Sequence, residues 1–167
     1  PTSPTPDTLR PWQFFTLGAL VCAGLMGFAL YAQYGLQLEP CPLCVMQRVA
    51  VIACGVVFLL GAIHNPVRIG AAIYSLLIVL IAAGGAAVAG RHVWLQTLPP
   101  DQVPACGPGL SYMLETMPFA DVLATVFRGD GNCANIDWSF LALSMPGWTL
   151  VFFVTMIVAG LVLTRRG

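Results

Sequence analysis

Four long apolar stretches constrain this chain more than any other feature of its sequence. A helix needs about 20 apolar residues to cross a hydrocarbon core of about 30 Å, and each stretch is close to that length. Backbone groups inside a bilayer must be satisfied within their own segment, so we expect each stretch to be a membrane-spanning α-helix. The predicted spans are approximately residues 12–34, 43–63, 69–91 and 147–164.

The composition also indicates a membrane protein. Only 8% of the residues are charged and 58% are hydrophobic, whereas a soluble domain typically carries about 25% charged residues. The formal net charge is zero and lysine is absent, which argues against a nucleic-acid partner, because such binding needs cations that contact phosphate. We therefore expect an all-α integral membrane protein, a four-helix transmembrane bundle that forms a single membrane domain over residues 1–167. The polar, proline-rich residues 1–11 are expected to be a disordered tail.

The arginines predict which way the bundle faces. Four spans place both termini on one side, and positively charged loops stay in the cytoplasm. Most arginines outside the spans fall on the side of the termini. We therefore expect cytoplasmic termini and two outward-facing loops, residues 35–42 and 92–146; in a bacterial inner membrane these loops are periplasmic. The arginines on the terminal side are Arg10, Arg68, Arg165 and Arg166, and those on the other side are Arg91 and Arg128.

A Cys-x-x-Cys pair opens the second span. Cys41 and Cys44 can close a small disulfide, bind half a metal site or transfer electrons. Pro42 is favoured in the first turn of a helix, which predicts Cys41 near the N-cap and Cys44 in the first turn, where the helix dipole stabilises a thiolate. Arg48 follows one turn deeper on the same face. A charge there is costly in lipid, so we expect Arg48 to serve the redox pair or an acceptor's carbonyl oxygen rather than to reach for lipid headgroups.

Two further cysteines, Cys106 and Cys133, lie in the second periplasmic loop. Four loop cysteines in an oxidising compartment allow three disulfide pairings. Two inert staples, Cys41–Cys44 and Cys106–Cys133, are one alternative, although closing a two-residue loop gains little chain entropy. A zinc site of all four cysteines is another alternative. It is disfavoured because structural zinc sites use paired Cys-x-x-Cys units, whereas Cys106 and Cys133 are far apart in the sequence. We therefore expect no metal site.

The remaining histidines and cysteines differ in what they are expected to do. His92 lies at the periplasmic end of the third span, at a depth similar to that of Arg48, where it can donate a hydrogen bond or a proton to the same acceptor. His64 lies on the cytoplasmic side and is given no role. Cys22 and Cys54 lie inside apolar runs and are expected to pack as small hydrophobic residues.

The second periplasmic loop contains a broken apolar stripe over residues 112–127, interrupted by Pro118. This pattern predicts a short interfacial helix that lies on the membrane surface. Such a helix would hold Cys106 and Cys133 close to the bilayer, while the glycines that flank these cysteines should leave them mobile.

These features together resemble the DsbB family of bacterial inner-membrane disulfide-bond-forming proteins. The family motif Pro-Cys-x-Leu-Cys-x-x-x-Arg is similar to residues 40–48 of this chain. A later pattern of Gly-x-Cys, then Trp, then Met-Pro-x-Trp at the entry to the last span is similar to residues 131–133, Trp138 and residues 145–148. The likeness covers about residues 12–165.

The resemblance implies a quinone-dependent thiol oxidase, as in the relay of DsbA, DsbB and quinone that keeps the periplasm oxidising. A reduced DsbA-type thioredoxin-fold partner is expected to attack the Cys106–Cys133 disulfide at Cys106. The released Cys133 then attacks Cys41, and Cys44 leaves as a thiolate that passes electrons to ubiquinone or menaquinone. The residues expected to line the quinone site are Cys44, Arg48 and His92.

Two other functions remain open from the sequence. One is a quinone reductase of the vitamin K epoxide reductase type, which also combines four helices with Cys-x-x-Cys but carries its active pair late in the bundle. The other is a non-enzymatic four-helix scaffold with stapled loops. A structural disulfide resists mild reductants, whereas a redox-active disulfide is reduced by them. Titration of the free thiols after mild reduction therefore separates a scaffold from an oxidase.

Overall fold

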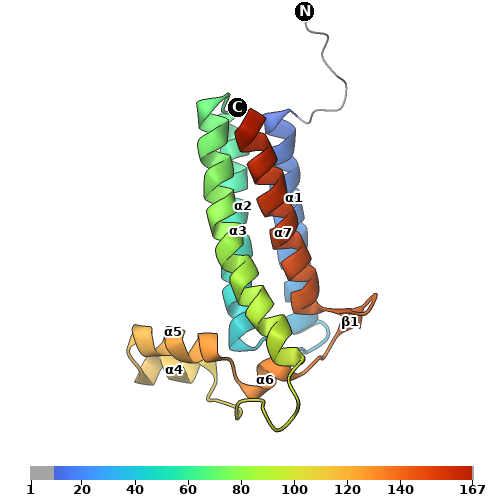
Figure 1. The fold of residues 1–167 in the computed structure, drawn as a ribbon, viewed down its shortest axis with the longest axis vertical. Helices are drawn as coiled ribbons and strands as arrows, with labels where there is room; N and C mark the ends of the chain where they lie inside the picture. The colour runs from blue at the N-terminus through green and yellow to red at the C-terminus, as the bar shows by residue number, and fades with distance from the viewer. Residues whose placement is uncertain (1–9, 167) are drawn as a thin grey trace, which may run out of the picture.

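Four long helices stand side by side, and the first turn of α1 and the last turn of α7 lie at the same end of them (Figure 1). This computed structural model describes residues 10–166, the side chain of Arg166 excepted, so the predicted disordered tail lies almost wholly outside the described residues. Each helix is long and apolar enough to cross a membrane, which confirms the predicted four-helix membrane bundle. The four are α1 (Pro11–Tyr34), α2 (Pro42–His64), α3 (Ile69–Gln96) and α7 (Met145–Arg166).

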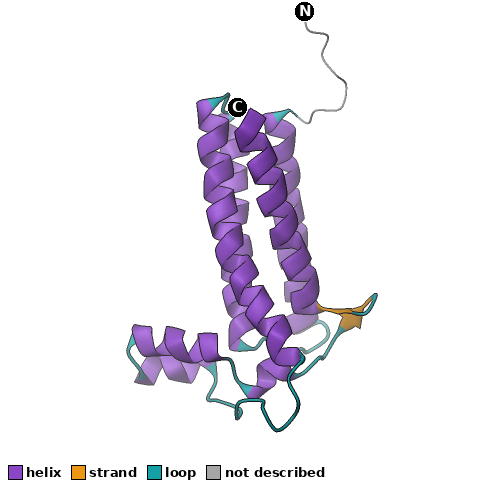
Figure 2. Ribbon diagram, in the orientation of Figure 1, coloured by secondary structure: helices purple, strands orange, loops and turns teal. Residues whose placement is uncertain are grey.

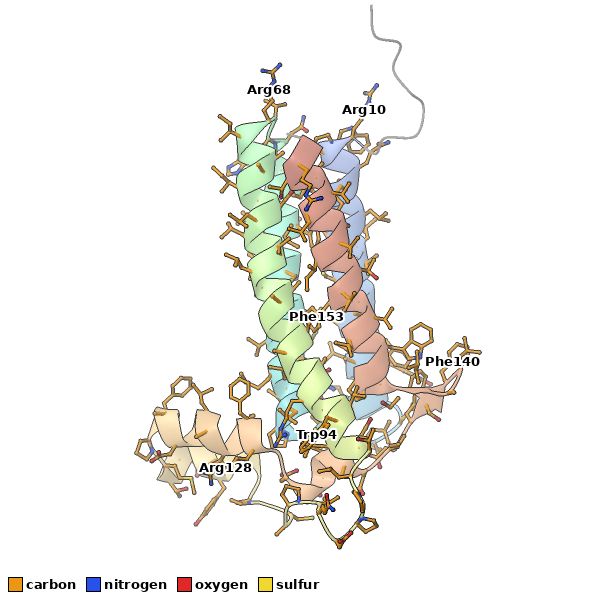
Figure 3. All side chains as sticks on the ribbon, in the orientation of Figure 1. Arg10, Arg68, Trp94, Arg128, Phe140 and Phe153 are labelled. Atoms are coloured by element: carbon orange, nitrogen blue, oxygen red, sulfur yellow. The ribbon has the colours of Figure 1, made fainter. Side chains whose placement is uncertain are left out.

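In two of the three helix pairs, α1–α2 and α3–α7, phenylalanine rings rest on glycines of the neighbouring helix. α1 packs on α2, α2 on α3 and α3 on α7. Phe153 of α7 lies midway along the bundle (Figure 3) and is fully buried against Gly85 of α3, where a Cβ atom would come within 2.4 Å of the ring. Phe58 of α2 rests in the same way on Gly18 of α1. Such close approach is how helices gain packing energy in lipid, where no hydrophobic force drives them together.

α3 continues to Gln96, beyond residue 91, where the third span was predicted to end. His92, the first residue of the predicted loop, is therefore part of the helix. Arg91 also stays helical: its guanidinium lies 4.3 Å from the ring centroid of Trp94 and donates to the carbonyl oxygens of Phe127 and Arg128. The arginine marks the end of the apolar run but not of the helix. The other spans differ from their predicted bounds by one or two residues.

The second loop contains two short helices where one was predicted, α4 (Leu110–Thr116) and α5 (Phe119–Arg128). Pro118 separates them because it has no N–H to donate and keeps Met117 in an extended conformation, with φ −125° and ψ 149°. The pair projects sideways from the end of the bundle that is remote from the termini (Figure 1). Its contact with a membrane surface stays a prediction.

A four-residue helix and a small hairpin complete the loop. α6 (Gly131–Ala134) precedes β1 (Ser139–Phe140) and β2 (Leu143–Ser144), which pair antiparallel beside the start of α7 (Figure 2). Leu141 and Ala142 form the turn, with φ of 50° and 64°. Such turns usually carry Asn-Gly or Asp-Gly, so nothing in this sequence pointed to a hairpin.

A second hydrophobic core closes the loop end of the bundle. Side chains of α4, α5 and α6 pack there against the start of α2 and the last turns of α3. Cysteines that are far apart in the sequence therefore share one small core. Its buried members are Cys41, Leu43, Val88, Leu95, Met113, Val122, Val126 and Cys133.

Candidate functional site

The Cys-x-x-Cys pair lies at the head of α2. Cys41 is the N-cap residue, with extended backbone angles of φ −69° and ψ 164°, and Pro42 begins the helix. The backbone N–H of Cys44 donates to the Cys41 Sγ over 3.4 Å, and the two sulfur atoms are 3.3 Å apart. Both thiols are free, Cys41 being buried and Cys44 partly exposed. The predicted positions, N-cap and first turn, are confirmed.

His92 of α3 faces this pair from a buried position, with 2% of its surface exposed. Its Nε2 lies 3.7 Å from the Cys41 Sγ and its Nδ1 lies 3.9 Å from the Cys44 Sγ. The amide nitrogen of Gln47, also buried, lies 2.9 Å from Nδ1. Because an amide nitrogen only donates, Nδ1 accepts this bond and the proton of the neutral ring is on Nε2, which faces Cys41.

Arg48 of α2 is tied to α1 rather than extended toward an end of the bundle. One guanidinium nitrogen donates to the side-chain oxygen of Gln33, and the other donates to the backbone carbonyl of Ala29 over 3.2 Å. These bonds hold a partly buried charge one turn below Cys44. The fixed guanidinium also lines the cavity described below.

Cys133 comes from α6 and meets the same group of side chains. It is fully buried, and its backbone N–H is capped by the Asp130 carboxylate over 3.2 Å. The Sγ atoms of Cys41 and Cys133 and a ring nitrogen of His92 all lie within 4.8 Å of one another. Hydrogen bonding to Cys41 and then burial raise the pKa of Cys133 well above that of an ordinary thiol. In the reduced chain the thiol form of Cys133 is therefore favoured over the thiolate.

Cys106 stands apart from this group. Its side chain is exposed. Its Sγ lies so close to Gly131 that a Cβ atom added to this glycine would be 2.9 Å from the sulfur. The sequence left the partners of the four loop cysteines open. In the structure Cys133 is gathered with Cys41 and His92, and Cys106 remains outside, so the four cysteines do not form one zinc cluster.

A cavity of about 570 Å³ opens beside Cys44. This volume is typical of sites that bury a small organic ligand. The walls are mainly apolar side chains from α1, α2, α7 and the loop before α7, and polar side chains from α2, α3 and the loops lie among them. The apolar members include Leu25, Met26, Phe28, Val51, Trp138, Met145 and Trp148, and the polar members at the cysteine end include Gln47, Arg48 and His92. The cavity therefore has mainly apolar walls, with polar side chains beside Cys44.

Two contributions to the site were missed from the sequence. Gln47 was not singled out, although an amide inside an apolar run, three residues after Cys44, was a usable signal. Trp138 and Trp148 entered only as parts of a motif, and the cavity shows that both line its wall.

The residues expected to have no role lie away from the site. Cys22 and Cys54 are buried within the bundle core, at 3% and 0% exposure. His64 ends α2 at the opposite end from Cys41 and hydrogen-bonds to the hydroxyl of Tyr74. Their positions agree with a packing role.

Four membrane-length helices with cysteines from two loops and a buried histidine beside an apolar cavity define a class of protein. It is the class of multi-pass membrane proteins that carry a cysteine redox centre.

Comparison with known proteins identifies the family within this class. The family described as "Disulfide bond formation protein DsbB" matches residues 11–163, and the chain belongs to this family. A protein of Hahella chejuensis named "Disulfide bond formation protein B" is 57% identical over 149 residues, covering 89% of this chain and 90% of its own length. A protein of the same name from Nitrosococcus oceani is 53% identical over 150 residues, covering 90% and 88%.

Proposed function

We propose that this chain is a quinone-dependent protein thiol:disulfide oxidoreductase that reoxidises a periplasmic DsbA-type thioredoxin-fold oxidant. The observation that carries the proposal is the gathering of Cys41, Cys44, Cys133 and His92 beside an apolar cavity, with Cys106 exposed outside it. Catalytic roles are proposed for the four loop cysteines, and quinone-binding roles for Arg48, His92 and Cys44.

Electrons enter at Cys106. In the oxidised resting enzyme Cys106 is bonded to Cys133, and a thiolate of the reduced partner attacks the Cys106 sulfur. The new bond is a mixed disulfide between partner and Cys106, and the Cys133 sulfur departs with the electron pair of the broken bond. The exposure of Cys106 supports this order, because a folded partner reaches an exposed sulfur and not the fully buried Cys133.

Cys133 then carries the electron pair to the second disulfide. It attacks Cys41 of the Cys41–Cys44 bond, so that a Cys41–Cys133 bond forms and Cys44 leaves as a thiolate. The short distance between the Cys41 and Cys133 sulfurs supports this step. Cys44, which lies in the first turn of α2 and lines the cavity, is the sulfur best placed to leave as an anion.

The remaining exchanges restore the enzyme. The partner's second thiol attacks the mixed disulfide, which oxidises the partner and frees Cys106. Cys106 attacks Cys133 of the Cys41–Cys133 bond and releases Cys41 as a thiolate. The chain then holds two reduced sulfurs, Cys41 and Cys44, and returns to its starting state when two electrons and two protons leave them.

The cavity suits a ubiquinone-type or menaquinone-type quinone, which when bound accepts two electrons and two protons. Its volume and apolar walls match such a ring. Arg48, held by Gln33 and Ala29, would bind a carbonyl oxygen by a charge-assisted bond. His92 holds a proton on the nitrogen that faces Cys41, and there it stabilises negative charge on that sulfur.

We propose a bacterial inner-membrane location with the site on the periplasmic side. Arg10 and Arg68 extend from the end of the bundle that carries the termini (Figure 3). The cysteine site lies at the other end, where α2 begins. This distribution supports cytoplasmic termini. The helices α4 and α5 would then rest on the periplasmic surface of the bilayer, because large apolar side chains such as Phe119 are exposed on them.

The test uses the full chain in detergent, a reduced DsbA-type partner and a soluble ubiquinone analogue, with quinone absorbance as the readout. Replacing Cys44 with Ser is expected to abolish quinone reduction, because Cys41 then has no Cys44 partner for a disulfide and no Cys44 thiolate is released beside the cavity. Cys22→Ala is the matched control and should retain turnover, because Cys22 is buried in the bundle core. Turnover by Cys44→Ser at the rate of the unmodified chain would overturn the proposal.

A further inference from the structure

Three potential metal ligands, two thiol sulfurs and one imidazole nitrogen, converge at the head of α2. The Sγ atoms of Cys41 and Cys133 and a nitrogen of His92 lie within 4.8 Å of one another. They come from three separate elements, α2, α6 and α3, so the fold itself assembles them. Cys133 and His92 are almost completely buried, with 0% and 2% of their surfaces exposed, and Cys41 is 9% exposed.

The spacing is close to that of a zinc site. Tetrahedral zinc, with bonds of about 2.3 Å to sulfur and about 2.0–2.1 Å to imidazole nitrogen, holds these two donors roughly 3.5 Å apart. The observed separation between the Cys41 Sγ and the His92 Nε2 is 3.7 Å. Closing the ligands around an ion therefore needs only small side-chain movements, and three protein ligands leave a fourth position for water or for the neighbouring Cys44 sulfur, 3.3 Å from Cys41.

We propose that the reduced chain binds one Zn²⁺-class cation through Cys41, Cys133 and His92, and that the bound ion halts thiol oxidation. Binding displaces two thiol protons and changes no oxidation state. Two thiolates, one neutral imidazole and a divalent cation sum to zero charge, so the buried site carries no uncompensated ion. The inhibition rests on the function proposed above, because it requires that the ion occupies sulfurs that would otherwise exchange. The binding of the ion does not depend on that function.

Redox state gates the site. A Cys41–Cys44 or a Cys106–Cys133 disulfide removes one of the three ligands, so the oxidised chain lacks the site. Zinc therefore stabilises the reduced form by mass action and withdraws it from the catalytic cycle.

Gln47 completes the arrangement as a positioning residue. A metal-bound histidine usually donates its other ring N–H to an oxygen. In the metal-free structure the Gln47 amide nitrogen faces Nδ1 of His92 at 2.9 Å, and a half-turn of the amide places its oxygen there instead. Loss of such a partner typically lowers metal affinity about 10- to 100-fold, which is the effect expected of Gln47→Leu.

The test titrates the full reduced chain, freed of reductant in detergent, with Zn²⁺ against a chromophoric chelator and with Co²⁺ alone. We expect one Zn²⁺ per reduced chain, thiolate-to-cobalt charge-transfer absorption, and neither in the oxidised chain. Cys133→Ser and His92→Phe should each lower affinity by more than tenfold. Cys106→Ser is the matched control and should bind as the unmodified chain does, because Cys106 is exposed and outside the cluster.

Equal affinity of the oxidised and reduced chains, or an unchanged affinity in Cys133→Ser, would overturn the site. Far-ultraviolet circular dichroism of each variant shows that it is folded, and Gln47→Leu gives a graded readout if a ligand variant fails to fold. Turnover with and without Zn²⁺, and after a chelator is added, tests the inhibition separately. If the unmodified chain reduces no quinone without zinc, the proposed function fails while the titration still decides the metal site.

Discussion

The amide nitrogen of Gln47 donates to Nδ1 of His92 over 2.9 Å, and the other nitrogen of the ring faces the Cys41 sulfur at 3.7 Å. The bond joins α2 to α3 inside the protein and determines which ring nitrogen carries the proton. A proton on Nε2 favours negative charge on Cys41, which arises when Cys41 is released from Cys133. Gln47 thereby acts on the cysteine pair without touching it.

Replacing Gln47 with Leu should shift the tautomer of His92 and slow the enzyme. One buried hydrogen bond contributes about 0.5–1.5 kcal/mol, so we expect quinone reduction to slow by about two- to tenfold. The nitrogen-15 chemical shifts of the ring report the tautomer directly. The chain has two histidines, so a His64→Phe background leaves only the signals of His92. An unchanged tautomer in Gln47→Leu would contradict this role.

Arg48→Met should raise the KM for a short-chain quinone while leaving the thiol exchange steps intact. A hydrogen bond to a charged group contributes about 1.5–3 kcal/mol, which predicts an increase in KM of about 10- to 100-fold. Steady-state quinone kinetics measure it, and stopped-flow exchange with the reduced partner provides the second readout. Gln33→Ala, which removes one anchor of the guanidinium, should give a smaller increase. Equal loss of partner exchange in Arg48→Met would show a structural defect instead.

The four spans and the place of the Cys-x-x-Cys pair were predictable because their signals are local. An apolar run of membrane length has few alternatives to a helix, and Pro42 after Cys41 fixes where α2 begins. The end of α3 was not predictable in the same way. Packing against the loop helices keeps α3 helical past Arg91, and those contacts join residues that are far apart in the sequence.

The contents of the site were only partly predictable for the same reason. The cysteines and His92 are rare residue types at suggestive positions, whereas the proximity of Cys133 to Cys41 depends on how a long loop folds over the bundle. Gln47 gains its significance only from the position of His92 on another helix. Pro118 was seen to interrupt the apolar stripe, but the two separate helices that result were not foreseen.

Alkylation should distinguish Cys106 from Cys133, the two cysteines between α3 and α7, in the reduced protein. Cys106 is exposed and should react first with iodoacetamide, as followed by peptide mass spectrometry. Because the pKa of Cys133 is raised, its thiolate fraction at pH 8 is smaller than that of an ordinary thiol, and its reaction rate should keep rising as the pH increases past 9. A Cys133 rate that reaches a plateau below pH 9 would contradict the raised pKa.

Gly85→Ala should destabilise the bundle, because the added methyl group would meet the Phe153 ring of α7 at 2.4 Å. Overpacking of this kind costs about 1–3 kcal/mol. The expected result is a fall of several degrees in the thermal midpoint of the protein in detergent. Gly84→Ala is the matched control, since no atom lies within 4 Å of a Cβ at that position. Equal midpoints for the two variants would show that α3 and α7 do not pack as described.

A tryptophan placed at Phe119 should be quenched by brominated lipids if α4 and α5 rest on the membrane. Phe119 is 68% exposed, and an exposed apolar side chain is more favourable in lipid than in water. Asp101→Trp, in the exposed loop between α3 and α4, is the control and should be quenched much less. Difference spectra against the unmodified chain remove the signal of its four native tryptophans. Equal quenching at both positions would argue against a surface-bound helix pair.

The most direct measurement is the visible absorbance of the purified chain with added quinone. A Cys44 thiolate held beside a quinone ring should give a charge-transfer band, and that band should vanish in Cys44→Ser and persist in Cys22→Ala. An identical band in Cys44→Ser, or none in the unmodified chain at any redox state, would contradict electron transfer from Cys44 to a quinone in this cavity.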